Sequence, residues 1–281
     1  MSGDPLSSAA AAEGPQSPQE YYRNLRHLLE MEVADGIAFA PRPEASSPVP
    51  VQKSAPSAAA SPAPAATSPA TASPSAPAVP APDFAPADAP AQQRLARVAE
   101  LVADCRRCGL CDAGRQRTVP GEGAVDARLL FVGEGPGFEE DRSGRPFVGP
   151  AGQLLDRMIL AMGLSREQVF IANVVKCRPP DNRAPQGDEA AACLPYLQEQ
   201  VAAIQPQIIC TLGNTPLRAL RGDERAGITR SRGTPFTWLG VTVLPTFHPS
   251  YLLRNESAKR LAWADLKQVM QLLELAPPSR P

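Results

Sequence analysis

The chain has 281 residues and carries 28 Lys and Arg against 29 Asp and Glu, so its formal net charge at pH 7 is −1. No run of about 18 apolar residues occurs, which excludes a protein that spans a membrane. The opening residues MSGDPLSS lack the basic and apolar stretches of a signal peptide. We therefore expect a cytoplasmic protein, whose six cysteines bind metal or catalyse rather than form disulfides.

The first third of the chain differs in composition from the rest. Residues 41–91 form a linker rich in Pro, Ala and Ser, which buries too little apolar surface to fold. Ahead of it, residues 1–40 form a tail with one short amphipathic helix, which starts at Ser17 and ends at Gly36. This helix either frays or docks on a protein partner.

Residues 92–281 have the length of one compact domain. They carry 24 basic and 20 acidic residues, and this net charge of +4 is compatible with a polyanionic partner without requiring one. Short apolar runs predict buried strands at 128–132, 169–175, 207–212 and 241–244. Helical periodicity predicts helices at 91–104, 149–162, 187–204, 214–220 and 259–275. Apolar strands that alternate with helices indicate an α/β fold, with a parallel sheet covered on both faces.

Polar and glycine-rich residues follow the predicted strands. The sequence GEGPG starts at Gly133 after the first strand, Asn173 lies late in the second, and His248 follows the fourth. Ligands of parallel α/β sheets bind beyond the carboxyl ends of the strands, so these residues predict a site there. A nucleotide-phosphate loop is disfavoured, because Pro136 removes a backbone N–H and no Walker sequence occurs.

Four cysteines have the spacing of a metal site. Cys105 and Cys108 form C-x2-C, and Cys177 and Cys193 follow from separate segments. Four thiolates suit either a [4Fe–4S] cluster or tetrahedral zinc, and the wide last gap favours the cluster without excluding zinc or no metal. Cys111 extends the first pair to C-x2-C-x2-C and is an alternative ligand. Cys210, inside a predicted strand, is interpreted as a small buried hydrophobe.

Three segments resemble one family. They are GEGPGFEEDRSGRPFVGPAGQLLD at 133–156, NVVKCRPPDNRAP at 173–185 and FHPSYLLRN at 247–255. In this order, and with the four cysteines, they resemble the family 4, iron–sulfur uracil-DNA glycosylases. The resemblance covers nearly all of the domain and none of residues 1–90. It implies a three-layer α/β/α sandwich around a four-stranded parallel sheet. It also implies a [4Fe–4S] cluster with a structural role, held by Cys105, Cys108, Cys177 and Cys193.

The resemblance implies a function as well: hydrolysis of the N-glycosidic bond of uracil in DNA, the first step of base excision repair. The enzyme is expected to be a monomer associated with the nucleoid. Such enzymes extrude the target base into a pocket. Phe147 would stack on the uracil, Asn173 would read its edge, and Glu140 would lie where thymine carries its extra methyl group. His248 would donate to uracil O2 and stabilise the departing anion.

Further roles follow from the same resemblance. Gly135 stands where some members of the superfamily have a water-orienting Asp, so its backbone, together with Glu134 and Asn182, would organise the attacking water. On different grounds, its position four residues after His248, Leu252 would enter the gap left by the flipped base, as apolar wedges do in other DNA complexes. Arg254, together with Arg178 and Arg183, would contact phosphates.

Two other functions compete with hydrolysis. One branch of the superfamily binds uracil covalently through a histidine in an inserted loop, but the segment from Asn173 to Cys193 contains no histidine. An electron-transfer protein would explain the cysteines and would leave the loops at Gly133 and His248 without a role.

Overall fold

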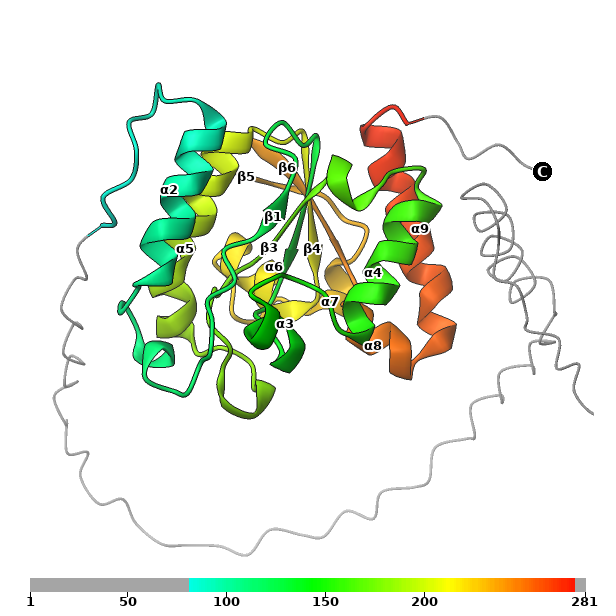
Figure 1. Ribbon diagram of the computed structural model, residues 1–281. Helices are drawn as coiled ribbons and strands as arrows, with labels where there is room; N and C mark the ends of the chain where they lie inside the picture. The colour runs from blue at the N-terminus through cyan, green and yellow to red at the C-terminus, as the bar shows by residue number, and fades with distance from the viewer. Residues whose placement is uncertain (1–80, 276–281) are drawn as a thin grey trace, which may run out of the picture.

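A computed structural model describes residues 81–275, shown in colour in Figure 1. The predicted tail helix and most of the predicted linker lie outside these residues. Phe84, which falls within the predicted linker, packs edge-on against Tyr196 of the domain, with the ring centroids 6.0 Å apart. No helix in the described part of the chain is long and apolar enough to cross a membrane.

The fold is built on one sheet with the strand order β1-β3-β2-β4-β6-β5. The strands are β1 (Glu122–Gly123), β2 (Leu129–Gly133), β3 (Phe170–Asn173), β4 (Ile208–Leu212), β5 (Phe236–Trp238) and β6 (Val241–Thr246). The four central strands, β3, β2, β4 and β6, are parallel and correspond to the four that the sequence predicts. The α/β class is confirmed, but the sheet has six strands rather than four.

The two additional strands are short and antiparallel, and they lie at the edges of the sheet. β5 forms a hairpin with β6, and both turn residues, Leu239 and Gly240, have positive φ, as a tight two-residue hairpin requires. β1 pairs with β3 through Gly123. A Cβ at Gly123 would collide with the backbone of Val169, so only glycine fits there.

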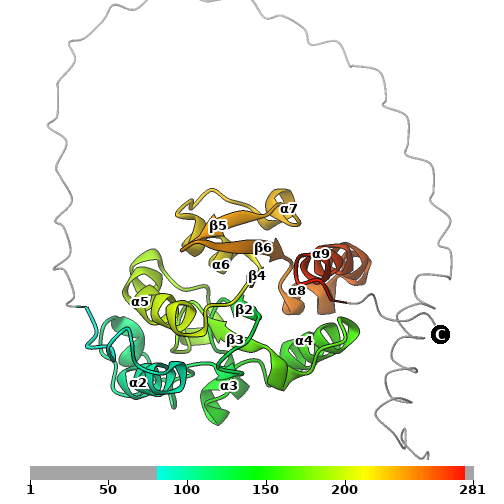
Figure 2. The same ribbon diagram turned by 90° about the horizontal axis from the view of Figure 1, so that it is seen from above.

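Helices cover both faces of the sheet, as the view from above shows (Figure 2). The longer helices are α2 (Ala91–Ala103), α4 (Pro150–Ala161), α5 (Gly187–Ile204), α6 (Asn214–Arg221) and α9 (Lys259–Leu272). Shorter helices are α3 (Phe138–Ser143), α7 (Ile228–Ser231) and α8 (Pro249–Arg254). One apolar core joins the sheet to α4 and α9, and a second joins it to α2 and α5.

Alternate residues of β2 enter the two cores. Leu129 and Phe131 pack with α4 and α9, whereas Leu130 and Val132 pack with α2 and α5. All residues of β2 are buried, which is why the strand is an unbroken apolar run in the sequence. The parallel strands end at a common edge, from which α3 and α8 begin at the bottom of Figure 1. The predicted site residues Gly133, Asn173 and His248 lie at this edge.

Candidate active site and sulfur-lined cavity

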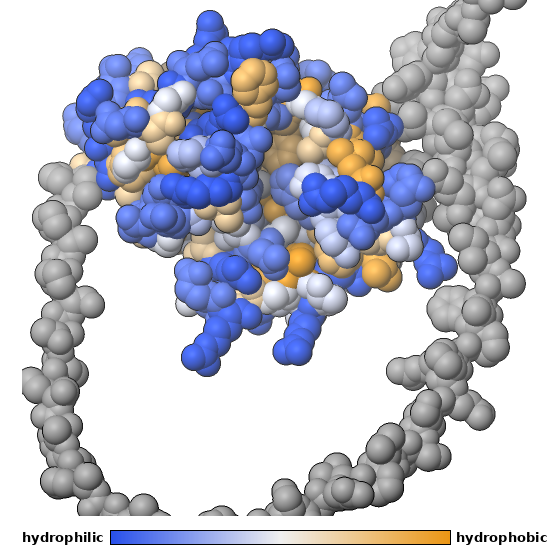
Figure 3. Space-filling view, turned by 90° about the horizontal axis from the view of Figure 1, so that it is seen from below, coloured by the Kyte–Doolittle hydropathy of each residue, from blue (hydrophilic) through white to orange (hydrophobic). Residues whose placement is uncertain are grey.

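Phe147 and Asn173 meet at the end of β2. Gly133, its last residue, lies opposite Asn173 in the β2–β3 pairing. A methyl group on Gly133 would lie 2.5 Å from Cζ of Phe147 and closer still to Oδ1 of Asn173. The ring of His248, just after β6, has its centroid 5.7 Å from that of Phe147. The structure thus brings an aromatic ring, an amide and an imidazole together. Viewed from this edge, the surface has a hollow with a paler, less hydrophilic floor (Figure 3).

The side chain of Asn173 has an unused acceptor. The residue is 2% exposed, and its Oδ1 has no hydrogen-bond partner among the described residues. A buried, unpaired polar atom costs about 1–3 kcal/mol, so proteins seldom retain one without a use for it. The atom lies beside the ring of Phe147. This arrangement suits a planar ligand that stacks on the ring and donates a hydrogen bond to the amide oxygen.

Phe147 is held in a strained conformation. Its φ of +51° falls in the left-handed region, which bulky residues rarely adopt. Arg166 stabilises this turn from behind, because its Nη1 donates to the carbonyl of Phe147 at 3.2 Å and pairs with Asp156 at 2.6 Å. On the other side Gly152 of α4 leaves room for the same carbonyl, which a Cβ would strike. The residues around Arg166 in the sequence give no sign of this contact, so the sequence does not predict it.

Glu140 joins the two loops around the site. Its Oε2 accepts from the backbone N–H of Gly137 at 3.1 Å, at the start of α3. Its Oε1 accepts from the N–H groups of Val148 at 2.9 Å and Gly149 at 3.1 Å. The carboxylate therefore fixes the segment after Phe147 against the loop that follows β2.

The geometry of His248 determines which ring nitrogen carries its proton. Nδ1 accepts from the backbone N–H of Ser250 at 3.1 Å, and the Ser250 hydroxyl lies 2.7 Å away. Burial, assisted by the positive charge of Arg254, lowers the pKa of His248 to about 4. At neutral pH the ring is uncharged, and because Nδ1 is an acceptor, Nε2 carries the proton. His248 is therefore a neutral donor through Nε2.

The loop after β2 also contacts the segments behind it. Glu134 accepts a hydrogen bond through Oε2 from the hydroxyl of Thr215 in the first turn of α6. Gly135 has no room for a side chain, since a Cβ there would lie 2.7 Å from Cγ2 of Val175. Any group that Gly135 offers to a ligand is consequently a backbone group.

Asn182 lies on an exposed turn with unusual backbone geometry. Both Asp181 and Asn182 have positive φ, at 53° and 52°. The Oδ1 of Asn182 accepts from Nε of Arg178 at 2.7 Å, and the guanidinium of Arg178 lies 5.2 Å from the ring centroid of Phe138. These contacts connect the turn after β3 to α3.

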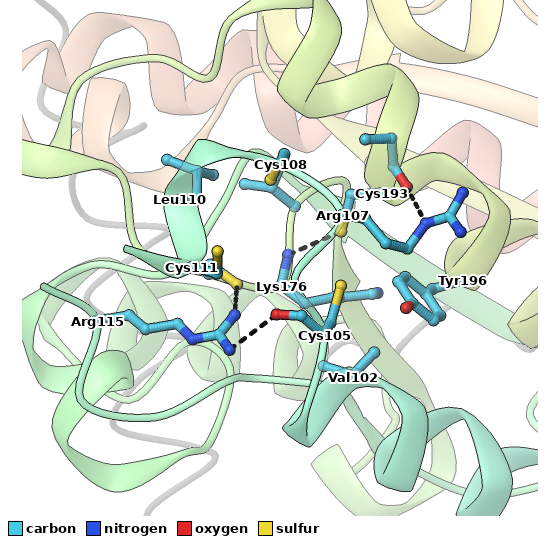
Figure 4. A pocket seen from close by; sticks show the side chains of 13 residues that line it. Val102, Cys105, Arg107, Cys108, Leu110, Cys111, Arg115, Lys176, Cys193 and Tyr196 are labelled. Atoms are coloured by element: carbon cyan, nitrogen blue, oxygen red, sulfur yellow. Dashed lines mark hydrogen bonds between the residues drawn. The ribbon is translucent and has the colours of Figure 1, made fainter. Parts of the chain in front are cut away.

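A second candidate site is a cavity lined by five cysteines (Figure 4). They are Cys105, Cys108, Cys111, Cys177 and Cys193. N–H groups donate to two of the sulfurs: Nη1 of Arg115 to Cys177 at 2.8 Å, and the backbone of Lys176 to Cys193 at 3.3 Å. N–H donors to sulfur are typical of iron–sulfur sites. Cys210, by contrast, is fully buried in β4, as the sequence predicts.

The donor set of the sulfur-lined cavity suits a metal bound by thiolates. Within residues 81–275, no three His, Cys, Asp or Glu side chains are arranged to hold one metal ion. Burial raises the pKa of Cys177 to about 11 and that of Cys193 to about 12, so both are thiols unless a metal deprotonates them. Soft thiolates from separate segments around one cavity suit either an iron–sulfur cluster or a tetrahedral zinc ion. Cys111 lines the cavity too, so it remains an alternative ligand.

Comparison with known proteins agrees with this geometry. Residues 120–267 match the family model of the uracil DNA glycosylase superfamily. A type-4 uracil-DNA glycosylase of Thermotoga maritima is 47% identical over 180 residues, which are 63% of this chain and 93% of that protein. A type-4 uracil-DNA glycosylase of Sulfurisphaera tokodaii is 44% identical over 63% of this chain and 84% of its own length. A type-5 uracil-DNA glycosylase of Pyrobaculum aerophilum is 32% identical over 55% of this chain and 74% of its own length.

The chain belongs to the uracil DNA glycosylase superfamily. Among the relatives compared, the type-4 proteins are more similar to it than the type-5 protein. The family resemblance found in the sequence is thus confirmed.

In this glycosylase the structure contradicts the expected wedge. Leu252 is 1% exposed and belongs to the core that contains Phe147 and α9, so it is not available to enter DNA. Its position four residues after His248 places it on the inner side of α8. Its neighbours Tyr251 and Leu253 are 40% and 42% exposed and face outward instead. Counting along the chain could not reveal this, because the direction of each side chain depends on how α8 packs.

The three arginines expected at phosphates have different environments. Arg183 forms a two-pronged ion pair with Glu189, at 2.8 and 2.7 Å, which anchors the start of α5. Arg178 is bound to Asn182. Arg254 is exposed at the end of α8, and no hydrogen bond or ion pair joins it to another described residue. Arg254 is therefore the best placed of the three for a phosphate.

Thr211 offers a contrast to Asn173. Its Oγ1 is also buried without a partner in the described part of the chain, but the strand alternation places it on the face opposite Phe147. Thr211→Val keeps the shape and removes the unpaired hydroxyl, so the free energy of unfolding should rise by about 1 kcal/mol. Urea unfolding at pH 7 measures this, and a decrease would reveal a hidden partner of the hydroxyl.

Proposed function

We propose that this protein excises uracil from DNA by hydrolysing the N-glycosidic bond, which releases free uracil and leaves an abasic site as the first step of base excision repair. The observation that carries the proposal is the unpaired Oδ1 of Asn173 beside Phe147, whose ring in turn lies next to that of His248. A base within a duplex cannot reach these residues, so the target nucleotide is extruded.

Recognition of uracil follows from the donors and acceptors of the amide. The base stacks on Phe147, its N3–H donates to Oδ1 of Asn173, and its O4 accepts from Nδ2. Cytosine has an acceptor at N3 and a donor at C4, so both bonds would be lost. Stacking alone is worth about 1–3 kcal/mol and tolerates any base, so the amide provides the selectivity. Glu140 contributes to the exclusion of thymine through the loops that it fixes.

Catalysis depends on charge that develops as the bond breaks. The departing uracil becomes an anion, and Nε2–H of His248 donates to its O2. This interaction strengthens only as negative charge accumulates, so it stabilises the transition state more than the ground state. A neutral donor also avoids the cost of burying a cation.

The attacking water is organised at the loop after β2. The carboxylate of Glu134, held by Thr215, and the backbone of Gly135 provide an acceptor and polar groups next to the site. Asn182, on the turn after β3, also helps to organise the water, and Arg178 orients its amide. Because residue 135 is glycine, no carboxylate at that position orients the water.

Cys105, Cys108, Cys177 and Cys193 would hold a [4Fe–4S] cluster, which when bound supplies structural cross-linking of α2, the exit of β3 and α5. Purified protein should contain about four iron atoms per chain and absorb visible light broadly. Removal of the iron by a chelator should lower the thermal unfolding temperature, since binding energy of a structural metal is also folding energy. Colourless, folded protein that contains zinc would contradict this assignment.

DNA binding involves the surface around α8. Arg254 contacts a phosphate, and the exposed Tyr251 and Leu253 take the wedge role that Leu252 cannot. The protein acts as a monomer in the cytoplasm on nucleoid DNA.

The activity is tested with oligonucleotides that contain uracil, thymine, cytosine or hypoxanthine. Full-length, iron-loaded protein should release free uracil and leave an alkali-labile abasic site, with at least 100-fold preference, about 2.7 kcal/mol, for uracil over cytosine. Intact DNA after incubation would overturn the proposal. A protein–DNA adduct that survives denaturation would favour covalent binding instead. Reversible electron transfer without base release would favour a redox protein.

The lowered pKa of His248 also predicts how stability depends on pH. The unfolded chain binds a proton as pH falls below 6.5, whereas the folded imidazole resists protonation until about 4. The unfolded state therefore binds more protons in this window, and stability is lost as pH falls from 6.5 to about 4. Urea unfolding at pH 7 and pH 4.5 should show a smaller loss for His248→Gln than for the original chain. An equal loss would show that His248 titrates normally.

A further inference from the structure

The side chain of Lys176 connects the two sites described above. Lys176 is 1% exposed and lies between Asn173, which faces the candidate uracil pocket, and Cys177, which lines the cysteine cavity. Its Nζ donates to the backbone carbonyl of Asn173 at 2.9 Å and to Oε1 of Gln200 at 2.7 Å. A buried ammonium is costly unless it is well paired, so its placement must provide a compensating interaction.

The backbone of Lys176 is held on the cluster side. Its N–H donates to Sγ of Cys193 at 3.3 Å, which Figure 4 shows as a dashed line. Its carbonyl accepts from the N–H of Val119 at 2.8 Å. Lys176 is thus attached by its main chain to a cysteine of α5 and by its side chain to the end of β3.

Gln200 anchors the far side of the ammonium. It is 2% exposed, and its Nε2 donates to the carbonyl of Pro120 at 2.7 Å. The amide is therefore oriented, with its oxygen toward Nζ of Lys176. The Nζ of Lys176 cannot move to another acceptor without breaking its bonds to Asn173 and Gln200.

The backbone of Asn173 carries its side chain, so fixing the backbone carbonyl restricts where the side-chain amide can lie. Asn173 is the last residue of β3, and the residues after it no longer form a regular strand. The amide plane must meet the edge of a base to within fractions of an ångström, since a misplacement of about 1 Å can reduce a rate about 100-fold. The N–H groups of Val174 and Val175 hold the chain after β3 to Gly133 and Glu134, and Lys176 adds a side-chain bond at the carbonyl of Asn173 itself.

We propose that Lys176 is a positioning residue for uracil recognition, which holds the base-reading amide of Asn173 in register with the cysteine cavity. This inference rests on the proposed function and extends it. It also gives the cluster a second consequence for activity, because movement of Cys193 would displace Lys176 and, through it, Asn173.

The test uses full-length, iron-loaded protein and the variant Lys176→Met, which keeps an unbranched apolar stem and removes the ammonium. Four quantities are measured: iron per chain, the Kd for DNA with an abasic site, the Ki of free uracil, and kcat and KM. We expect the iron content and abasic-site Kd to stay within about twofold, the Ki of uracil to rise about tenfold and kcat to fall about 100-fold. A purely structural role would change affinity for abasic DNA as much as affinity for uracil.

An unchanged Ki of uracil in iron-loaded Lys176→Met overturns the inference. If Lys176→Met loses its iron or does not fold, the variant Gln200→Leu tests the inference instead. Gln200→Leu keeps Lys176 and removes one of the two acceptors of its ammonium. The Ki should then rise about threefold with the iron retained, since the ammonium is less well fixed. An unchanged Ki overturns the inference here too. Failure of the original protein to release uracil would instead reject the proposed function.

Discussion

Replacing His248 with alanine should lower kcat for uracil excision by about 10²–10³, the usual cost of removing one donor that faces developing negative charge. His248 is the one histidine in residues 92–281, so no other imidazole can substitute. Its tautomer is fixed by the N–H of Ser250, which makes Nε2 the only donor of the ring. Single-turnover rates with saturating enzyme measure the chemical step without contributions from product release.

Two controls accompany this variant. Ser250→Ala retains the backbone N–H that orients the ring and removes only the hydroxyl, so its effect should be several-fold smaller than that of His248→Ala. His248→Ala should retain its iron, since His248 does not line the cysteine cavity. It should also bind abasic DNA normally, since abasic DNA has no uracil O2 for the ring to contact. A fall of less than tenfold in kcat would show that O2 of uracil is stabilised by another group.

Gly133→Ala should reduce kcat/KM for uracil by about 100-fold or more, since displacement of reacting groups by about 1 Å has effects of this size. The added methyl group would lie within 2.5 Å of the ring of Phe147 and nearer still to the amide oxygen of Asn173. One of these two groups must move. The Ki of free uracil and kcat/KM should change together, because stacking and edge reading are both disturbed.

Gly187→Ala is the matched control. Gly187 begins α5, and nothing lies within 4 Å of a Cβ built there. The same chemical change should leave uracil excision unaltered and stabilise the fold by about 0.4–1 kcal/mol through the unfolded chain. Normal activity in Gly133→Ala would show that Phe147 and Asn173 have more freedom than their packing suggests.

The amino-acid sequence by itself determined the central parallel strands and the long helices of this glycosylase. Strands buried on both faces must be continuous apolar runs, and in a parallel sheet the residues after such runs gather at one edge. This is why the loop at Gly133, Asn173 and His248 could be predicted at one edge, and why the central strands and long helices were predicted close to their observed bounds. Phe147 was added to this site only by the family resemblance. The spacing of the cysteines indicated a metal site, and the family resemblance selected Cys105, Cys108, Cys177 and Cys193 as its ligands.

Only the tertiary structure decided the contacts between distant segments. The edge strands have only two and three residues, too few to show a period in the sequence, so their pairing with β3 and β6 could not be predicted. The burial of Leu252, the attachment of Glu140 to backbone N–H groups and the bond from Lys176 to Asn173 each depend on how elements pack. A side chain that binds a remote main-chain group leaves no periodicity in the sequence, because the partner is defined by position in space and not by residue type.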